Sequence, residues 1–241
     1  MRDGIAAYDV PARIATYDAD MDVMHPLRHE MVAAALALLP FDSTAEFTAL
    51  DLGAGTGYFT QRLVEAFPAV RVIAIDGAES MIPVARERLG EAAQRVDFRV
   101  GDLRGLDELL VAGEQGRVVI SSYALHHLDA REKTGVVERC LGFLEPGGWF
   151  LNADLIRSES ELLEDRYQDA RVQGIVRRAD PADARFGAPE EVRAFLDAMQ
   201  EKEGDQPLTL QEDLAVLRAA GLRQVGVSWL EHREAVTSGV R

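Results

Sequence analysis

The sequence predicts an α/β fold in which helices cover both faces of a doubly wound, mostly parallel sheet. Between residues 46 and 155, short apolar runs alternate with segments of helical spacing. Strands that are apolar on both faces are typical of a parallel sheet. A second observation is the stretch ALDLGAGTGYFT, residues 49–60, which places three glycines directly after the first apolar run. A strand that ends in such a turn and opens a helix is a common ligand site in α/β folds.

The expected elements follow in a regular order. We expect strands at residues 47–52, 71–76, 96–102, 117–123 and 149–155. Helices are expected at residues 57–67, 78–93, 106–113 and 131–144, because Pro83 is tolerated in a first turn and Gly113 can close a helix. Residues 208–222 then form an amphipathic helix with Thr209 as N-cap, followed by two closing strands at 223–230 and 232–240.

The segments outside this alternation divide the chain into four parts. Residues 1–45 are predicted to be a helical N-terminal lid segment, and residues 46–157 the Rossmann-like core. Residues 158–204 are charged and helix-prone, which predicts a helical insertion or cap, and residues 205–241 supply the last helix and closing hairpin of the core. We expect both helical segments to lie over the carboxyl edge of the sheet and to exclude water there.

The composition excludes several classes of partner. Lys and Arg total 26 and Asp and Glu total 41, so the net charge is −15 and no basic patch interrupts it. Nucleic acid, DNA above all, and anionic lipid are therefore not expected as partners. Cys140 stands alone among apolar residues, which predicts a buried helix position. The start of the chain has no signal-peptide core and the longest apolar run, 31–39, is too short to span a bilayer, so we expect a cytoplasmic protein.

The glycine-rich turn distinguishes between ligand classes. Missing Cβ atoms let a ligand contact the main chain. A dinucleotide site of the form G-x-G-x-x-G needs glycine where this chain has Tyr58, and no G-K-[ST] follows that would make a P-loop. A nicotinamide dehydrogenase is therefore disfavoured.

The run Asp51-Leu52-Gly53-Ala54-Gly55-Thr56-Gly57 resembles the first motif of the class I S-adenosylmethionine-dependent methyltransferases. Later stretches resemble that family's further motifs in order: VIAIDGAESMIPVARERL, DFRVGDLRGL, VVISSYALHHL and LGFLEPGGWFLNADL. The resemblance implies a seven-stranded sheet with an antiparallel last strand, S-adenosyl-L-methionine as the cofactor and a small-molecule methyl acceptor. The stretches 1–45 and 158–204 lie where such enzymes vary.

The resemblance also implies roles for individual residues. Asp76 would accept hydrogen bonds from both ribose hydroxyls, while Asp102 would accept from the adenine amino group. For the adenosine part we expect contacts from Asp76, Gly77, Met81, Gly101, Asp102 and Leu103. For the aminoacyl and sulfonium part we expect contacts from Arg28, Asp51, Gly53, Ala54, Gly55, Gly57, Ser122 and Tyr123.

The acceptor side is predicted from two residues. Methyl transfer is an in-line displacement, and a base is required only if the nucleophile arrives protonated. Neighbours on a helix point about 100° apart, so one of His126 and His127 should face the pocket. By resemblance to small-amine and phospho-base methyltransferases, His127 is the candidate base or substrate orienter and Tyr17 its partner.

Several alternatives remain at this point. His25 and His29 have i, i+4 spacing but no third ligand nearby, so no metal site is predicted. A carboxy-S-adenosylmethionine synthase-like enzyme, which modifies the cofactor itself, shares the architecture, and a non-catalytic cofactor-binding protein is a further possibility. The charged segment after residue 160 is a candidate contact of a homodimer.

Overall fold

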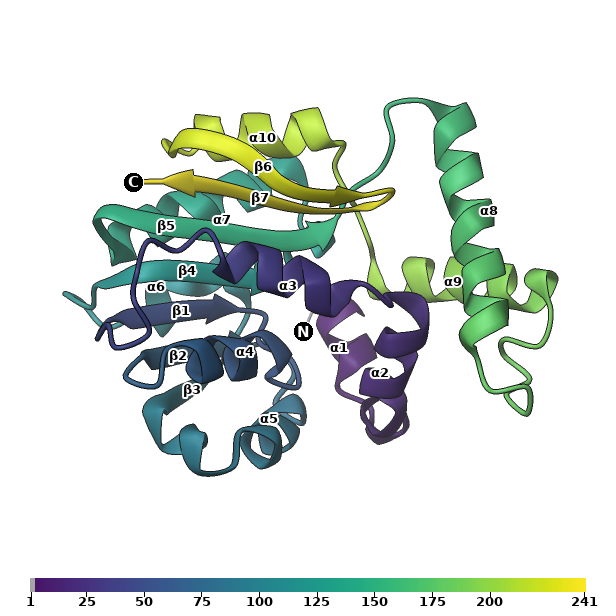
Figure 1. The fold of residues 1–241 in the computed structure, drawn as a ribbon, viewed down its shortest axis with the longest axis horizontal. Coiled ribbons are helices and arrows are strands. Elements are labelled where there is room, and N and C mark those ends of the chain that lie inside the picture. Colours follow the sequence, from purple (N-terminus) through teal and green to yellow (C-terminus); the bar gives the residue numbers. More distant parts are fainter. Residues whose placement is uncertain (1–2) are drawn as a thin grey trace.

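A seven-stranded sheet forms the centre of the computed structural model, which describes residues 3–241 (Figure 1). The strand order is β3-β2-β1-β4-β5-β7-β6, and β7 is antiparallel to both of its neighbours. This arrangement confirms the predicted doubly wound, mostly parallel sheet. The strands are β1 (Thr48–Leu52), β2 (Arg71–Asp76), β3 (Val96–Val100), β4 (Gly116–Ser122), β5 (Leu144–Leu155), β6 (Arg223–Glu231) and β7 (Glu234–Val240).

Two apolar layers enclose the sheet because its strands are buried on both faces. One layer joins Leu50 and Phe150 to α7 and α10, and the other joins Ala49 and Val72 to α3 and α4. Cys140 is buried in the first layer, as predicted. The helices on the two faces are α3 (Arg28–Leu36), α4 (Tyr58–Ala66), α5 (Met81–Leu89), α6 (Leu106–Leu109), α7 (Ala130–Phe143) and α10 (Leu210–Ala219).

The remaining helices gather beyond the carboxyl edge of the parallel strands (Figure 1). They are α1 (Asp3–Tyr8), α2 (Pro11–Met24), α8 (Glu161–Arg178) and α9 (Pro189–Glu203). Met21, Ile175 and Leu196 belong to a separate apolar cluster that packs α2 against α8 and α9. The N-terminal segment is therefore divided, since α3 covers the sheet and only α1 and α2 join the cap. Within the described residues, no helix is long and apolar enough to cross a membrane.

Candidate functional site

The three glycines between β1 and α4 have different neighbours. All three have positive φ angles, at 69° for Gly53, 53° for Gly55 and 78° for Gly57. A Cβ on Gly53 would lie 2.3 Å from the Cβ of Ala124, and one on Gly57 would lie 3.0 Å from that of Ala85, whereas one on Gly55 would meet nothing within 4 Å. Gly53 and Gly57 thus permit close packing, and Gly55 leaves main chain open. The expected ligand contact of Gly57 is a correction, because Ala85 of α5 occupies that side.

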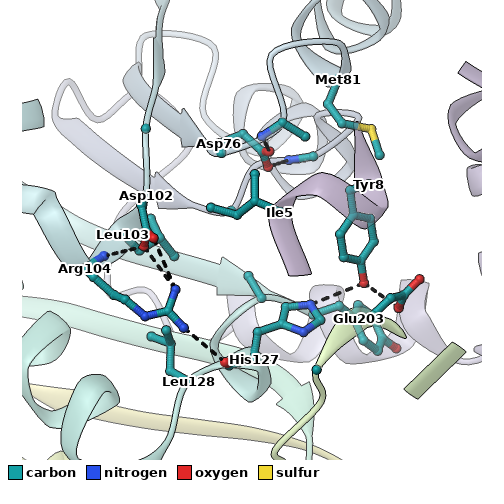
Figure 2. Close-up of a pocket in the computed structure, with 18 of the residues that line it drawn as sticks. Ile5, Tyr8, Asp76, Met81, Asp102, Leu103, Arg104, His127, Leu128 and Glu203 are labelled. Atoms are coloured by element: carbon teal, nitrogen blue, oxygen red, sulfur yellow. Dashed lines mark hydrogen bonds and ion pairs between the residues drawn. The ribbon is translucent and has the colours of Figure 1, made fainter. Parts of the chain in front are cut away.

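A cavity of about 380 Å³ opens beside this turn (Figure 2). It lies between the carboxyl ends of the strands and the cap, and α1 and α9 form its far wall. The structure brings together at this cavity the predicted residues Tyr17, Gly53, Gly55, Asp76, Gly77, Met81, Gly101, Asp102, Leu103, Tyr123 and His127. Residues as far apart in the chain as Tyr17 and His127 therefore share one ligand-sized space.

Asp76 connects the glycine turn to the turn that follows β2. Its carboxylate accepts hydrogen bonds from the main-chain N–H of Gly55 at 2.6 Å and of Ala78 at 2.8 Å. Burial raises the pKa of Asp76, although these two hydrogen bonds lower it. A carboxylate has about four acceptor positions, so two remain for ligand hydroxyls. The space that we expected Gly77 to leave for a ribose holds the side chain of Ile5, which would lie 2.8 Å from a Cβ there.

Asp102 is held by Arg104, which the sequence analysis did not identify. Asp102 caps the short turn after β3 by accepting from the N–H of Arg104 at 2.9 Å, and the Arg104 guanidinium lies 3.2 Å from the same carboxylate. Arg104 also donates to Glu132 at 2.7 Å. A second donation runs to the carbonyl oxygen of His127 at 3.4 Å (Figure 2). This arginine therefore joins the two walls of the cavity.

Arg28 and Asp51 border a smaller cavity of about 30 Å³ on the other side of the glycine turn. Arg28 is buried, lies 3.0 Å from Asp22 and stacks over the ring of Tyr58 at 4.1 Å. Asp51 accepts from the Thr60 hydroxyl, and burial raises its pKa to about 7. A guanidinium and a carboxyl group on opposite sides of one small space suit an amino acid, which carries both charges. Ala54, Ser122 and Tyr123 also line this space.

His127 meets Tyr8 rather than Tyr17. The Tyr8 hydroxyl lies 3.3 Å from His127 Nε2 and donates to Glu203 at 2.7 Å (Figure 2). Tyr17 lines the cavity but packs against the Tyr8 ring, with 6.1 Å between ring centroids. Burial raises the pKa of Tyr8 well above its usual value. Tyr8 and Glu203 come from α1 and α9, which is why no local pattern indicated them.

The two adjacent histidines face different surroundings. His127 lines the cavity, while His126 is buried with its Nδ1 2.6 Å from Asp154. Asp205 lies close to both rings, 3.5 Å from His126 Nε2 and 3.0 Å from His127 Nδ1. Burial alone would lower the pKa of His126, but Asp154 and Asp205 raise it to about 10. Burial and the neighbouring His126 lower the pKa of His127.

Comparisons with known proteins agree with this architecture. Residues 49–148 match the family model described as a methyltransferase domain. The chain is 27% identical over 176 residues to a malonyl-[acyl-carrier protein] O-methyltransferase of Priestia megaterium, an alignment that covers 73% of this chain and 60% of that protein. This chain thus spans about three fifths of that relative.

Solved structures resemble the whole chain. An O-methyltransferase family protein from Burkholderia thailandensis superposes with a TM-score of 0.68 at 20% identity, over 98% of this chain and 62% of that one. The DhpI–SAH complex superposes with a TM-score of 0.63 at 19% identity, over 99% of this chain and 95% of that one. At these identities the likeness shows a shared fold.

Proposed function

We propose that the chain, whose residues 49–148 match a methyltransferase domain, is a class I S-adenosylmethionine-dependent methyltransferase that moves the methyl group of S-adenosylmethionine to an oxygen or nitrogen atom of a small molecule. S-Adenosyl-L-methionine is the cofactor that the family uses. The observation that carries the proposal is the Gly55–Asp76 pair, in which open main chain and a buried carboxylate meet at the mouth of a ligand-sized cavity.

The charges along the cavity support one orientation of the cofactor. Asp76 offers acceptor positions to the ribose, and Asp102 with the N–H of Leu103 offers an acceptor and a donor to the adenine edge. Arg28 and Asp51 border the small cavity at the opposite end, where they suit the carboxylate and ammonium of the methionine part. This orientation directs the sulfonium between Tyr123 and the cap.

The chemistry places modest demands on side chains. The acceptor atom forms a bond to the methyl carbon as the carbon–sulfur bond breaks, and S-adenosylhomocysteine leaves neutral at sulfur. Because the sulfonium charge fades during transfer, alignment and exclusion of water should supply most of the acceleration. We assign His127, Tyr8 and Tyr17 to positioning of the acceptor, since all three line the cavity beside α9.

The acceptor class is tested by measuring turnover. The full chain is incubated with cofactor and a panel of small alcohols, phenols, carboxylates and amines, and S-adenosylhomocysteine is quantified. Acceptor-dependent formation of that product together with a methylated acceptor is the expected result. If prephenate instead yields a modified cofactor, the chain is a carboxy-S-adenosylmethionine synthase-like enzyme. Cofactor binding without any turnover would contradict the proposal.

A further inference from the structure

Three potential metal-binding side chains converge behind the acceptor wall. One ligand atom each from His126, His127 and Asp205 lies within 4.8 Å of the others. Asp205 follows α9, and its loop is fixed by a hydrogen bond from the N–H of Gln206 to the carbonyl oxygen of His126 at 2.7 Å. The cluster is enclosed, since the side chains of His126 and Asp205 are 4% and 10% exposed.

Asp205 and His127 lie close together in this cluster, but their atoms are not aligned as in a hydrogen bond. Asp205 Oδ1 and His127 Nδ1 are 3.0 Å apart, yet within residues 3–241 both are buried atoms without a hydrogen-bond partner. The contact is an ion pair without an aligned hydrogen bond, and a buried carboxylate oxygen and ring nitrogen that lack such a bond are costly. Their arrangement therefore points to a further occupant.

The far side of each imidazole ring is already held. His126 Nδ1 contacts Asp154 at 2.6 Å, and His127 Nε2 contacts the Tyr8 hydroxyl at 3.3 Å. Because Tyr8 donates its own proton to Glu203, its oxygen is free to accept from His127. The Nδ1 lone pair of His127 can then face Asp205, whereas His126, whose pKa is raised, must release its Nε2 proton to solvent when a metal ion binds. Carboxylate and hydroxyl partners on the distal nitrogen are typical of metal-binding histidines.

The two separations measured from Asp205 match those of ligands around one ion. Ligand atoms about 2.1 Å from a metal are about 3.0 Å apart at a 90° angle and about 3.4 Å apart at a tetrahedral angle. The observed separations from Asp205 Oδ1 are 3.0 Å to His127 and 3.5 Å to His126. Ligand atoms around a metal ion direct their lone pairs at the ion and not at one another. This accounts for the missing hydrogen-bond alignment between Asp205 and His127.

We propose that His126, His127 and Asp205 bind one divalent first-row transition metal ion. Imidazole nitrogens favour zinc, iron, nickel and copper over magnesium and calcium. His127 and Gln206 also line the large cavity, so open coordination positions would face the acceptor. The proposal replaces our expectation of no metal, which considered only His25 and His29.

Direct binding tests the site without requiring methyl transfer. The full chain is treated with a chelator and titrated with Co²⁺ while visible absorption is recorded, and Zn²⁺ binding is measured by calorimetry. We expect one equivalent of either ion to bind saturably. Asp205→Asn and His127→Gln should each weaken binding at least ten-fold, and His29→Gln, which removes an exposed histidine, should not.

Two outcomes would overturn the site: no saturable Co²⁺ absorption, or an equal loss of affinity in His29→Gln. Melting curves of the metal-free variants separate unfolding from lost ligation. If Asp205→Asn fails to fold, Tyr8→Phe provides a second test, because it removes the hydroxyl that holds His127 Nε2. Loss of such a supporting group usually costs about 10–100-fold in metal affinity, so unchanged binding in Tyr8→Phe would contradict the proposal.

Discussion

The two ends of the large cavity are built in different ways. At the end where we propose the cofactor, main-chain groups form the wall, as in the hydrogen bond from Gly55 to Asp76, two residues 21 positions apart on neighbouring strand ends. At the acceptor end side chains form it, and Tyr8 reaches His127 across 119 positions and Glu203 across 195. The geometry of the sheet therefore determines where the residues of the first end lie. The packing of the cap determines where the residues of the second end lie. Changes at the two ends should separate cofactor binding from acceptor recognition.

The carboxyl groups at the two ends also differ in protonation. Burial raises the pKa of Asp51 to about 7 and raises that of Asp76, and among residues 3–241 neither has a cationic side chain hydrogen-bonded to it. Burial also acts on Asp205, but His126 and His127 lower its pKa below the usual value. At the acceptor end, the charge of Asp205 is thus balanced by the neighbouring histidines. At the cofactor end, the carboxyl groups are suited to a cationic ligand.

The largest effect is expected from a methyl group at the glycine turn. Gly53→Ala would place a Cβ 2.3 Å from Ala124 in a left-handed backbone conformation, so it should destabilise the fold by about 3 kcal/mol. Gly55→Ala meets no neighbour, so it should cost about 1 kcal/mol and mainly weaken cofactor binding. Chemical unfolding and calorimetry with S-adenosylhomocysteine measure the two effects. Equal destabilisation by both changes would show that the glycines are equivalent.

A pH-dependent effect is expected at Asp51. Its pKa is about 7 in the fold and near the usual aspartate value of about 3.9 when unfolded, so the folded state holds the proton more tightly. Stability from this group is complete below about pH 4 and is lost as the pH rises toward 7. Asp51→Asn cannot ionise, so its Tm should exceed that of the wild type by several degrees at pH 8 and match it at pH 4.

The matched control for Asp51→Asn is Asp97→Asn, which removes an exposed carboxylate on β3. It should show no comparable gain in Tm between pH 4 and pH 8. The same Asp51→Asn protein should bind S-adenosylhomocysteine more weakly, since the ligand ammonium loses its opposite charge. A Tm difference that stays constant with pH would contradict the raised pKa.

A smaller effect is expected at the acceptor end. Tyr8→Phe removes the hydroxyl between His127 and Glu203, so KM for the acceptor should rise about ten-fold through loss of a hydrogen bond. Because the Tyr8 hydroxyl bonds to His127 and Glu203 and not to the glycine turn or Asp76, the Kd of S-adenosylhomocysteine should change less than two-fold, about 0.4 kcal/mol. Steady-state kinetics and calorimetry provide both values. A parallel loss of cofactor affinity would mean that the two ends are not separable.

The sequence was informative where function depends on neighbouring elements. The strand that ends at Asp76 and the turn at residues 53–57 were identified from local pattern, and their meeting follows from adjacent parallel strands. The family resemblance added the antiparallel seventh strand. Contacts made by the cap were not predictable in this way, because they join residues of α1 and α9 that are more than 100 positions from their partners in the chain.

Particular residues illustrate this limit. Tyr17 was chosen by resemblance to methyltransferases that place an N-terminal tyrosine near this histidine, yet Tyr8 one helix earlier reaches His127. Gly77 was expected to leave space, but Ile5 of α1 fills it. Arg104 and Asp205 lie in charged, turn-rich stretches that resemble ordinary surface, and their partners come from distant elements. Only the packed structure distinguishes them from solvent-exposed charges.

The central claim is that open main chain at Gly55 and the carboxylate of Asp76 together hold an adenosyl ligand. Calorimetry of S-adenosylhomocysteine with the wild type, Asp76→Ala and the control Asp97→Ala tests it most directly. Two hydrogen bonds to a charged group are worth about 1.5–3 kcal/mol each, so Asp76→Ala should weaken binding by about 100-fold or more while Asp97→Ala leaves it unchanged. Equal affinity of all three proteins, or no binding by the wild type, would contradict the account.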